Sequence, residues 1–229
     1  RIDTGGDDRE VLTQSTPAVA WMGYGIHGDE LASSDAAVMV AYRLAAGENE
    51  AIRRIRENLV VHIDPMHNPD GRARALAHVD TFRRSMPSSG PRDIVHNQFW
   101  ADGRGNHFFF DLNRDAVYQV QRQSRLRMRA ILEANPQLYV ASHETGWDTT
   151  YLFAVPAKPL NPFLPEPVHD SWADFSADHS AAFDERGKSY YTRSWNEVFY
   201  PGYYDILPAY LGAVPILYEQ AATSGLSVR

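Results

Sequence analysis

The sequence predicts an α/β fold with a mostly parallel, mixed central sheet and helices on both faces. Short apolar runs alternate with helical patterns along the 229 residues, and this alternation is typical of parallel strands joined by helices. A hydrophobic content of 44% and a charged content of 22% are ordinary for a globular protein with a sizeable core. We therefore expect a single domain over residues 1–229.

The first part of the chain predicts strand, helix, helix and strand in that order. A buried strand is expected over residues 18–24, because apolar residues follow one another there almost without a break. A helix is expected over residues 30–46, which are rich in Ala, Val, Met and Leu and end near Gly47. The charged segment 50–58 predicts a short helix, and the apolar run 59–63 predicts a second strand.

The remainder of the chain is expected to be more irregular. Residues 85–110 hold several prolines and glycines and predict a long loop over one face, of a kind that is more often functional than accidental. Helices are expected over residues 117–134 and 170–186, and the segment 156–169 between them contains five prolines and predicts a loop. Strands are expected over residues 138–142, 151–155, 189–195 and 213–218.

Charge and composition exclude several functions. The formal net charge of −7 and a pI near 5.7 argue against nucleic acid as a partner, because phosphate binding needs a basic face. The chain has no cysteine, so disulfides, thiolate metal sites and cysteine nucleophiles are ruled out. No apolar run reaches the length of a membrane span. The first residue is Arg1 and no signal peptide is visible, so the sequence does not settle the compartment; a secreted or periplasmic location is favoured. The oligomeric state also stays open.

The segment His27-Gly28-Asp29-Glu30 is the strongest chemical signal. It opens the first helical pattern, where side chains three residues apart share a face. An imidazole nitrogen and a carboxylate oxygen are thus placed within reach of one metal ion, and Zn²⁺ accepts both. His143, at the end of an apolar strand, is a candidate for a distant third ligand. Each signal alone is more often ordinary polarity at a helix start or a strand end.

Two further motifs have both a plain and a chemical interpretation. Asn68-Pro69-Asp70-Gly71 is composed of turn formers, and it lies at a strand end where α/β sheets place ligands. The pair Arg83-Arg84 is either a solvated basic pair or a source of one guanidinium for a developing oxyanion.

Two more signals follow later in the chain. In Asp111-Leu112-Asn113-Arg114, the side chains either cap a helix or recognise a substrate carboxylate through Asn113 and Arg114, with Asp111 orienting a metal-bound histidine. Glu219 follows an apolar strand, where a carboxylate either lies at the edge of the sheet or acts as a general base beside a metal.

In this order, the residues resemble those of the zinc carboxypeptidase family, the carboxypeptidase A-like metallopeptidases, and we expect a member of bacterial type. The matching set is His27-x-x-Glu30, Asn68-Pro69-Asp70-Gly71, Arg84-Ser85, Asn113-Arg114, His143 and Glu219. The resemblance covers nearly the whole chain and implies a carboxypeptidase-like fold. The chain starts 26 residues before His27 and ends 10 residues after Glu219, so we expect the core of a catalytic domain, truncated at both ends, or a minimal member.

The resemblance implies a reaction and its participants. His27, Glu30 and His143 would bind Zn²⁺. A peptide (amide) bond next to a free C-terminal carboxylate would be hydrolysed by metal-activated water. Glu219 would be the general base, and Arg84 would polarise the scissile carbonyl.

The resemblance also implies how the substrate is held. Asn113 and Arg114 would grip the terminal carboxylate, and Tyr200 is our candidate for the family's mobile tyrosine, with Tyr203 and Tyr204 as rivals. The specificity pocket would lie between Tyr200 and Ala213. That stretch is mostly apolar, which packing against the sheet explains equally well, and its one acidic residue, Asp205, could favour a basic terminal side chain.

Other functions stay open on the sequence alone. The same site could serve an amidohydrolase or deacylase that acts on acyl-amino-acid substrates, or a cell-wall peptide hydrolase. A non-catalytic peptide- or glycan-binding module is less favoured, because decayed relatives tend to lose the base or a ligand and here all of these residues are present.

Overall fold

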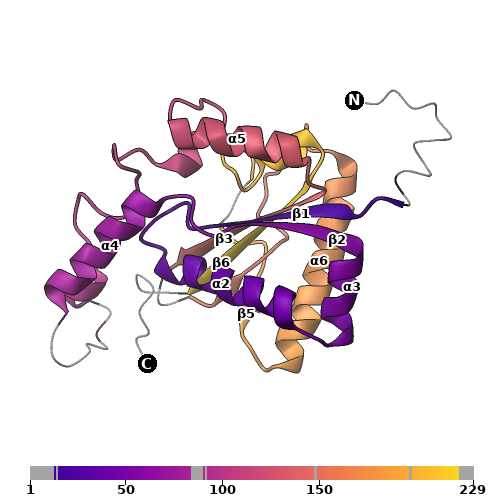
Figure 1. Ribbon diagram of the computed structural model, residues 1–229, viewed down its shortest axis with the longest axis horizontal. Helices are drawn as coiled ribbons and strands as arrows, with labels where there is room; N and C mark the ends of the chain where they lie inside the picture. The colour runs from indigo at the N-terminus through magenta and orange to yellow at the C-terminus, as the bar shows by residue number, and fades with distance from the viewer. Residues whose placement is uncertain are drawn as a thin grey trace.

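The structure, a computed structural model, describes residues 13, 15–83, 90, 92–146, 149–195 and 198–221. Six strands form one sheet in the order β2-β1-β3-β6-β4-β5 (Figure 1). The strands are β1 (Ala18–Tyr24), β2 (Leu59–Asp64), β3 (Leu138–Thr145), β4 (Tyr151–Leu152), β5 (Tyr190–Tyr191) and β6 (Val214–Ala221). The helices are α2 (Leu31–Ala46), α3 (Glu50–Asn58), α4 (Pro69–Phe82), α5 (Arg122–Ala134) and α6 (Glu166–Glu185). Short 3-10 helices are η1 (Ile94–His96), η2 (Leu112–Arg114) and η3 (Leu207–Leu211).

The four long strands run in one direction. β1 pairs in parallel with β2 and with β3, and β3 pairs in parallel with β6, so the carboxyl ends of all four meet at one edge of the sheet. β4 is antiparallel to β6 through the pair Leu152 and Glu219, which makes the sheet mixed. The expected α/β class with a mostly parallel, mixed sheet is confirmed.

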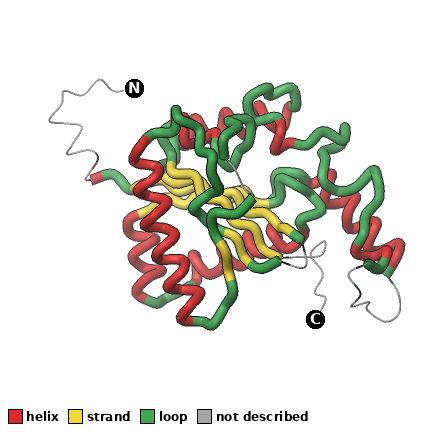
Figure 2. Tube along the Cα trace, turned by 180° about the vertical axis from the view of Figure 1, so that it is seen from behind, coloured by secondary structure: helices red, strands yellow, loops and turns green. Residues whose placement is uncertain are grey.

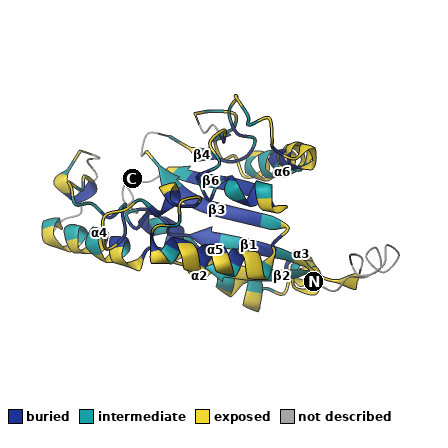
Figure 3. Cartoon of the chain, turned by 90° about the horizontal axis from the view of Figure 1, so that it is seen from above, coloured by how far each residue is buried: buried dark blue, intermediate teal, exposed yellow. Residues whose placement is uncertain are grey.

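The core lies on both faces of the sheet. Successive residues of a strand point to opposite faces, so Tyr139 packs with Ile131 of α5 while Val140 packs with Trp172 of α6. α5 therefore covers one face and α6 the other. Figure 1 shows α5 and α2 on opposite sides of the sheet, and Figure 3 shows β1, β3 and β6 buried between the helical layers.

The edge with the carboxyl ends of the strands carries long loops. α4 projects from the fold on that side, and loops lie between it and the strands (Figure 2). The motif Asn68-Pro69-Asp70-Gly71 is the start of α4. The Asn68 side chain caps this helix by accepting the Gly71 N–H at 2.9 Å, and Pro69 occupies the first turn, where a missing N–H costs nothing.

Two helices begin elsewhere than the sequence predicts. The expected helix over residues 117–134 begins only at Arg122, because the Asp115 carboxylate accepts the N–H groups of Val120 and Gln121 and holds the preceding segment as a turn. The expected helix over residues 170–186 begins earlier, at Glu166, because prolines are tolerated in a first helical turn.

The two expected strands at residues 151–155 and 189–195 are each only two residues long in the sheet. Beyond them, the Phe153 N–H donates to the Tyr191 carbonyl at 3.4 Å and the Arg193 N–H donates to the Val155 carbonyl at 2.8 Å. The two segments stay side by side through single bonds instead of a regular ladder.

Candidate metal centre

The first half of the centre lies where β1 passes into α2. Glu30 occupies the N-cap position of α2, yet its side chain makes no capping hydrogen bond. The carboxylate turns instead toward His27, and Glu30 Oε1 lies 2.6 Å from His27 Nδ1. The two groups do meet, but the expected reason is wrong: α2 begins only at Leu31, and a turn before it, in which the Glu30 N–H donates to the His27 carbonyl at 3.4 Å, brings them together.

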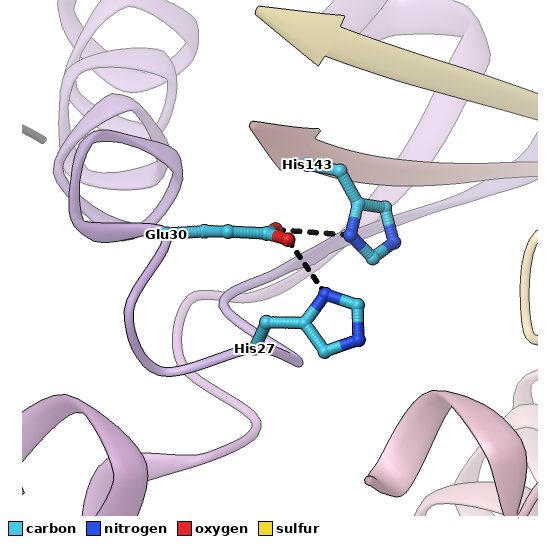
Figure 4. A group of neighbouring side chains, drawn as sticks. All are labelled: His27, Glu30 and His143. Atoms are coloured by element: carbon cyan, nitrogen blue, oxygen red, sulfur yellow. Dashed lines mark hydrogen bonds and ion pairs between the residues drawn. The ribbon is translucent and has the colours of Figure 1, made fainter. Parts of the chain in front are cut away.

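His143 completes the group from β3. Its Nδ1 lies 2.9 Å from Glu30 Oε2, so each carboxylate oxygen faces one imidazole (Figure 4). One potential ligand atom from each of the three residues lies within 4.8 Å of the others, and all three residues are buried. Two imidazole nitrogens and a carboxylate that converge in this way fit the donor set of a catalytic zinc site, so the group could hold a metal ion.

The outward nitrogen of each histidine faces a second carboxylate. His27 Nε2 lies 3.1 Å from Asp111 Oδ1, the contact that the resemblance implies. His143 Nε2 lies 3.1 Å from Asp205 Oδ1, a contact that the sequence did not predict.

The neighbouring carboxylates raise the pKa of both imidazoles in the metal-free protein. Burial disfavours a charged His143, but Glu30 and Asp205 on either side outweigh it and raise its pKa well above the ordinary value. Burial likewise opposes the charge of His27, and Glu30 and Asp111 raise its pKa in the same way. Burial alone would raise the pKa of Glu30, yet the two imidazolium groups lower it. A divalent cation binds the deprotonated imidazole, so zinc affinity is expected to depend on pH.

A second set of contacts connects the elements that carry the three residues. The Ser33 hydroxyl accepts the Gly25 N–H at 3.3 Å and donates to the Ser142 carbonyl at 2.8 Å, so it joins the end of β1, the first turn of α2 and β3. The Glu144 carboxylate accepts the Ser33 N–H at 2.9 Å. Glu144 thereby caps α2 in place of Glu30, which leaves the Glu30 carboxylate free to face the imidazoles.

Close backbone contacts bring a third loop to the centre. A Cβ on Gly28 would lie 2.1 Å from the backbone nitrogen of Arg72, and a Cβ on Gly71 would lie 2.3 Å from the carbonyl oxygen of Gly103. The loop before α2, the start of α4 and the loop around residue 103 therefore approach one another as closely as only glycine permits. This packing places Arg104 beside the metal centre.

The group opens into a cavity of about 420 Å³. The lining residues are His27, Glu30, Arg104, Asn113, Arg114, His143, Glu144, Thr145, Trp195, Tyr203, Asp205 and Glu219. The residues come from loops and strands that are distant in the sequence, and nine of them carry ionisable side chains.

Glu219 is the buried carboxylate of β6. It lies directly opposite His143 in the register of β3 and β6, and opposed residues of paired strands point to the same side of a sheet. Its Oε2 is buried and has no hydrogen-bond partner within the described part of the chain. Burial chiefly raises the pKa of Glu219 to about 7, and the Glu30 and Asp205 carboxylates add to this while His143 and His27 oppose it.

Arg84, the residue expected to polarise a carbonyl, lies outside the described residues. The guanidinium that the structure places at the cavity in addition to Arg114 is that of Arg104, whose Nε donates to Asp111 Oδ2 at 2.9 Å. Sequence reasoning missed Arg104. The available signal was an arginine between two glycines inside the long loop, Gly103-Arg104-Gly105, since glycines allow a backbone to approach a site closely.

Asn113 and Arg114 both line the cavity, but their side chains differ in burial and in how firmly hydrogen bonds hold them. Asn113 is buried, its Oδ1 accepts the Tyr204 N–H at 2.9 Å, and its Nδ2 donates to Asp205 Oδ2 at 3.1 Å. The Arg114 side chain is 50% exposed, and its guanidinium lies over the Tyr203 ring, 4.5 Å from the centroid. Arg114 is therefore the more available of the two for a substrate carboxylate.

The three tyrosines lie in different surroundings. Tyr200 is 39% exposed, packs against the Tyr203 ring and is not among the residues that line the cavity. A hydrogen bond with Tyr118 raises the pKa of Tyr200. Tyr204 is buried and its hydroxyl donates to the Ser124 carbonyl at 3.0 Å, so it is fixed in the core. The choice between Tyr200 and Tyr203 stays a prediction.

The comparisons with known proteins concern the family and the fold. The zinc carboxypeptidase family, peptidase M14, matches residues 5–154. The chain therefore belongs to the zinc carboxypeptidase family. This range includes His27, Glu30 and His143 but ends before Asp205 and Glu219. A comparison with curated proteins found no match.

Solved structures of metallocarboxypeptidases have the same fold. The metallo-carboxypeptidase of Burkholderia cenocepacia is 14% identical, with a TM-score of 0.67, over 95% of this chain and 50% of that one. The Pseudomonas aeruginosa enzyme, in complex with (2-guanidinoethylmercapto)succinic acid, is 14% identical, with a TM-score of 0.64, over 90% and 49%. Carboxypeptidase A of Helicoverpa armigera is 16% identical, with a TM-score of 0.60, over 92% and 53%.

At these identities the structural likeness establishes the fold alone. The chain spans about half the length of these solved structures. Among the described helices, none is long and apolar enough to cross a membrane.

Proposed function

We propose that this chain carries the active site of a zinc-dependent hydrolase that cleaves a peptide bond next to a free C-terminal carboxylate. One observation supports this most strongly: His27, Glu30 and His143 converge at a cavity that also presents Glu219 and two arginines. The group offers the two nitrogens and one carboxylate of a catalytic zinc site. Bound Zn²⁺ supplies a Lewis acid that polarises a carbonyl and acidifies a water molecule.

Glu219 is proposed as the general base. Its carboxylate is buried beside the cavity, and its unpartnered Oε2 is free to accept the proton of an attacking water. The same carboxyl group then returns that proton to the leaving amine.

The arginines are proposed to hold the negative groups of the substrate. Arg114 can offer two N–H groups to a terminal carboxylate, and its contact with the Tyr203 ring orients the guanidinium. Arg104, held through its Nε by Asp111, retains further N–H groups that can face a carbonyl oxygen as negative charge develops there. The role of Arg84 in polarising the scissile carbonyl stays a prediction from the sequence.

The test is hydrolysis by zinc-loaded protein of three matched substrates: a peptide with a free C-terminus, its C-terminal amide, and an N-acyl amino acid. We expect turnover of the free peptide, little turnover of the amide, and loss of activity on chelation that added Zn²⁺ restores. Preferred turnover of the N-acyl amino acid would favour a deacylase instead. Failure to bind zinc or to hydrolyse any of the three would refute the proposal.

Glu219→Gln tests the base. The variant is expected to bind Zn²⁺ as the parent does and to lose activity by roughly 10²–10⁴-fold, the usual contribution of a general base. Glu185→Gln is the matched control, because Glu185 lies at the exposed end of α6. If Glu219→Gln retains the turnover of the control, the base has been assigned wrongly.

A further inference from the structure

Asp205 occupies a place that its sequence context does not explain. It lies in the stretch expected to line the specificity pocket, where an acidic side chain could attract a basic substrate residue. In the structure both of its oxygens already have partners. Oδ1 faces His143 Nε2 at 3.1 Å, and Oδ2 accepts from Asn113 Nδ2 at 3.1 Å.

The contact matches the one on the other side of the centre. His27 presents Nδ1 to Glu30 and Nε2 to Asp111, and His143 presents Nδ1 to Glu30 and Nε2 to Asp205. The two imidazoles are thus held in the same way, each between the shared carboxylate and a second one.

Asn113 connects the two outer carboxylates. Its backbone N–H donates to Asp111 Oδ1 at 2.8 Å, and its side-chain amide donates to Asp205. The backbone next to Asp205 is fixed as well, because the Tyr204 N–H donates to Asn113 Oδ1 and Ile206 is fully buried. A carboxylate held by these contacts has little freedom to turn toward a substrate side chain.

A metal-binding histidine usually donates its other ring N–H to a carboxylate, which fixes both the tautomer and the plane of the ring. An ionised carboxylate only accepts hydrogen bonds, so with a cation bound the contact to Asp205 would keep the proton of His143 on Nε2, and Nδ1 would be the nitrogen left to bind the cation. We infer that Asp205 is a positioning residue for the metal ligand His143, and that it does not select the substrate side chain. This inference rests on the proposed zinc site.

Asp205→Asn is the principal test. We expect its affinity for Zn²⁺, measured by competition with a chromophoric chelator, to fall by roughly 10–100-fold, and the absorption spectrum of the Co²⁺-loaded protein to change. Asp111→Asn is expected to weaken zinc binding to a similar extent, and Asp174→Asn, on the exposed face of α6, to leave it unchanged. Unaltered zinc affinity in folded Asp205→Asn would overturn the inference.

Substrate preference separates positioning from selection. For peptides that end in a basic or an apolar residue, Asp205→Asn is expected to lower kcat/KM by the same factor. A selective loss on the basic peptide with full zinc affinity would overturn the inference.

The wild-type protein offers a test that does not depend on the folding of a variant. In the zinc-loaded protein, the ¹⁵N shifts of His143 are expected to show a protonated Nε2, and a protonated Nδ1 would overturn the inference. If the wild type binds no zinc, the proposed function fails together with the inference. If the wild type binds zinc and Asp205→Asn binds it equally well, only the inference fails.

Discussion

The buried carboxylate of Glu219 gives the metal-free protein a specific dependence of stability on pH. Burial raises the pKa of Glu219 from its ordinary value of 4.5 to about 7. Between these two pH values, the folded protein retains a proton that the unfolded chain has released, so stability is lost as the pH rises through this window. A tenfold change in proton affinity is worth about 1.4 kcal/mol, so full ionisation costs the folded state about 3 kcal/mol.

Glu219→Gln removes this titration and keeps the shape of the side chain. The free energy of unfolding of the variant relative to the wild type is therefore expected to rise by about 3 kcal/mol between about pH 4 and pH 8. Glu144, whose pKa is raised to about 7 mainly by burial, is present in both proteins, so its titration cancels in the difference. Urea unfolding of both proteins in the presence of a chelator, over this range of pH, measures the difference in the free energy of unfolding.

Saturation with Zn²⁺ supplies an internal check. A divalent cation beside Glu219 favours the ionised carboxylate, so the difference between variant and wild type is expected to shrink in the zinc-loaded proteins. A difference in stability that stays constant across the pH range without metal would refute the reasoning.

Four further substitutions test other contacts. Ser33→Ala removes two buried hydrogen bonds and is expected to lower the free energy of urea unfolding by about 1–3 kcal/mol; a loss below a few tenths would contradict the role of Ser33 as a link. Gly28→Ala places a Cβ against the backbone of α4, so we expect thermal melting to show a destabilisation of about 1–3 kcal/mol, together with weaker zinc binding. An unchanged melting temperature would mean that the backbone can move apart without cost and would contradict the need for glycine at this position. Leu112→Ala leaves a cavity at a fully buried position in the core beside α5, so the free energy of unfolding, measured with urea, is expected to fall by about 2–5 kcal/mol. A decrease of less than about 1 kcal/mol would contradict the close packing of Leu112. Arg114→Lys keeps the charge but loses the planar fork over Tyr203, so KM for a peptide with a free C-terminus is expected to rise roughly tenfold, and an unchanged KM would speak against carboxylate recognition by Arg114.

The boundaries of the elements show where local reasoning stops. β1 and α3 have the bounds that the apolar and charged patterns predict, because those patterns repeat with the period of the backbone itself. The start of α5 does not, because the Asp115 carboxylate binds N–H groups five and six residues ahead and overrides the helical pattern.

By itself the sequence determined the α/β class, because the periods of strands and helices are local features. It also carried the family resemblance, and through that resemblance it named His27, Glu30 and His143 as a metal-binding group. Only the tertiary structure decided which groups surround them. Arg104 reaches the cavity because glycines let separate loops approach, and Asp205 faces His143 because β3 and the segment before η3 pack together across 62 residues of chain. Contacts of this kind depend on how distant segments pack, and no period or spacing along the chain encodes them.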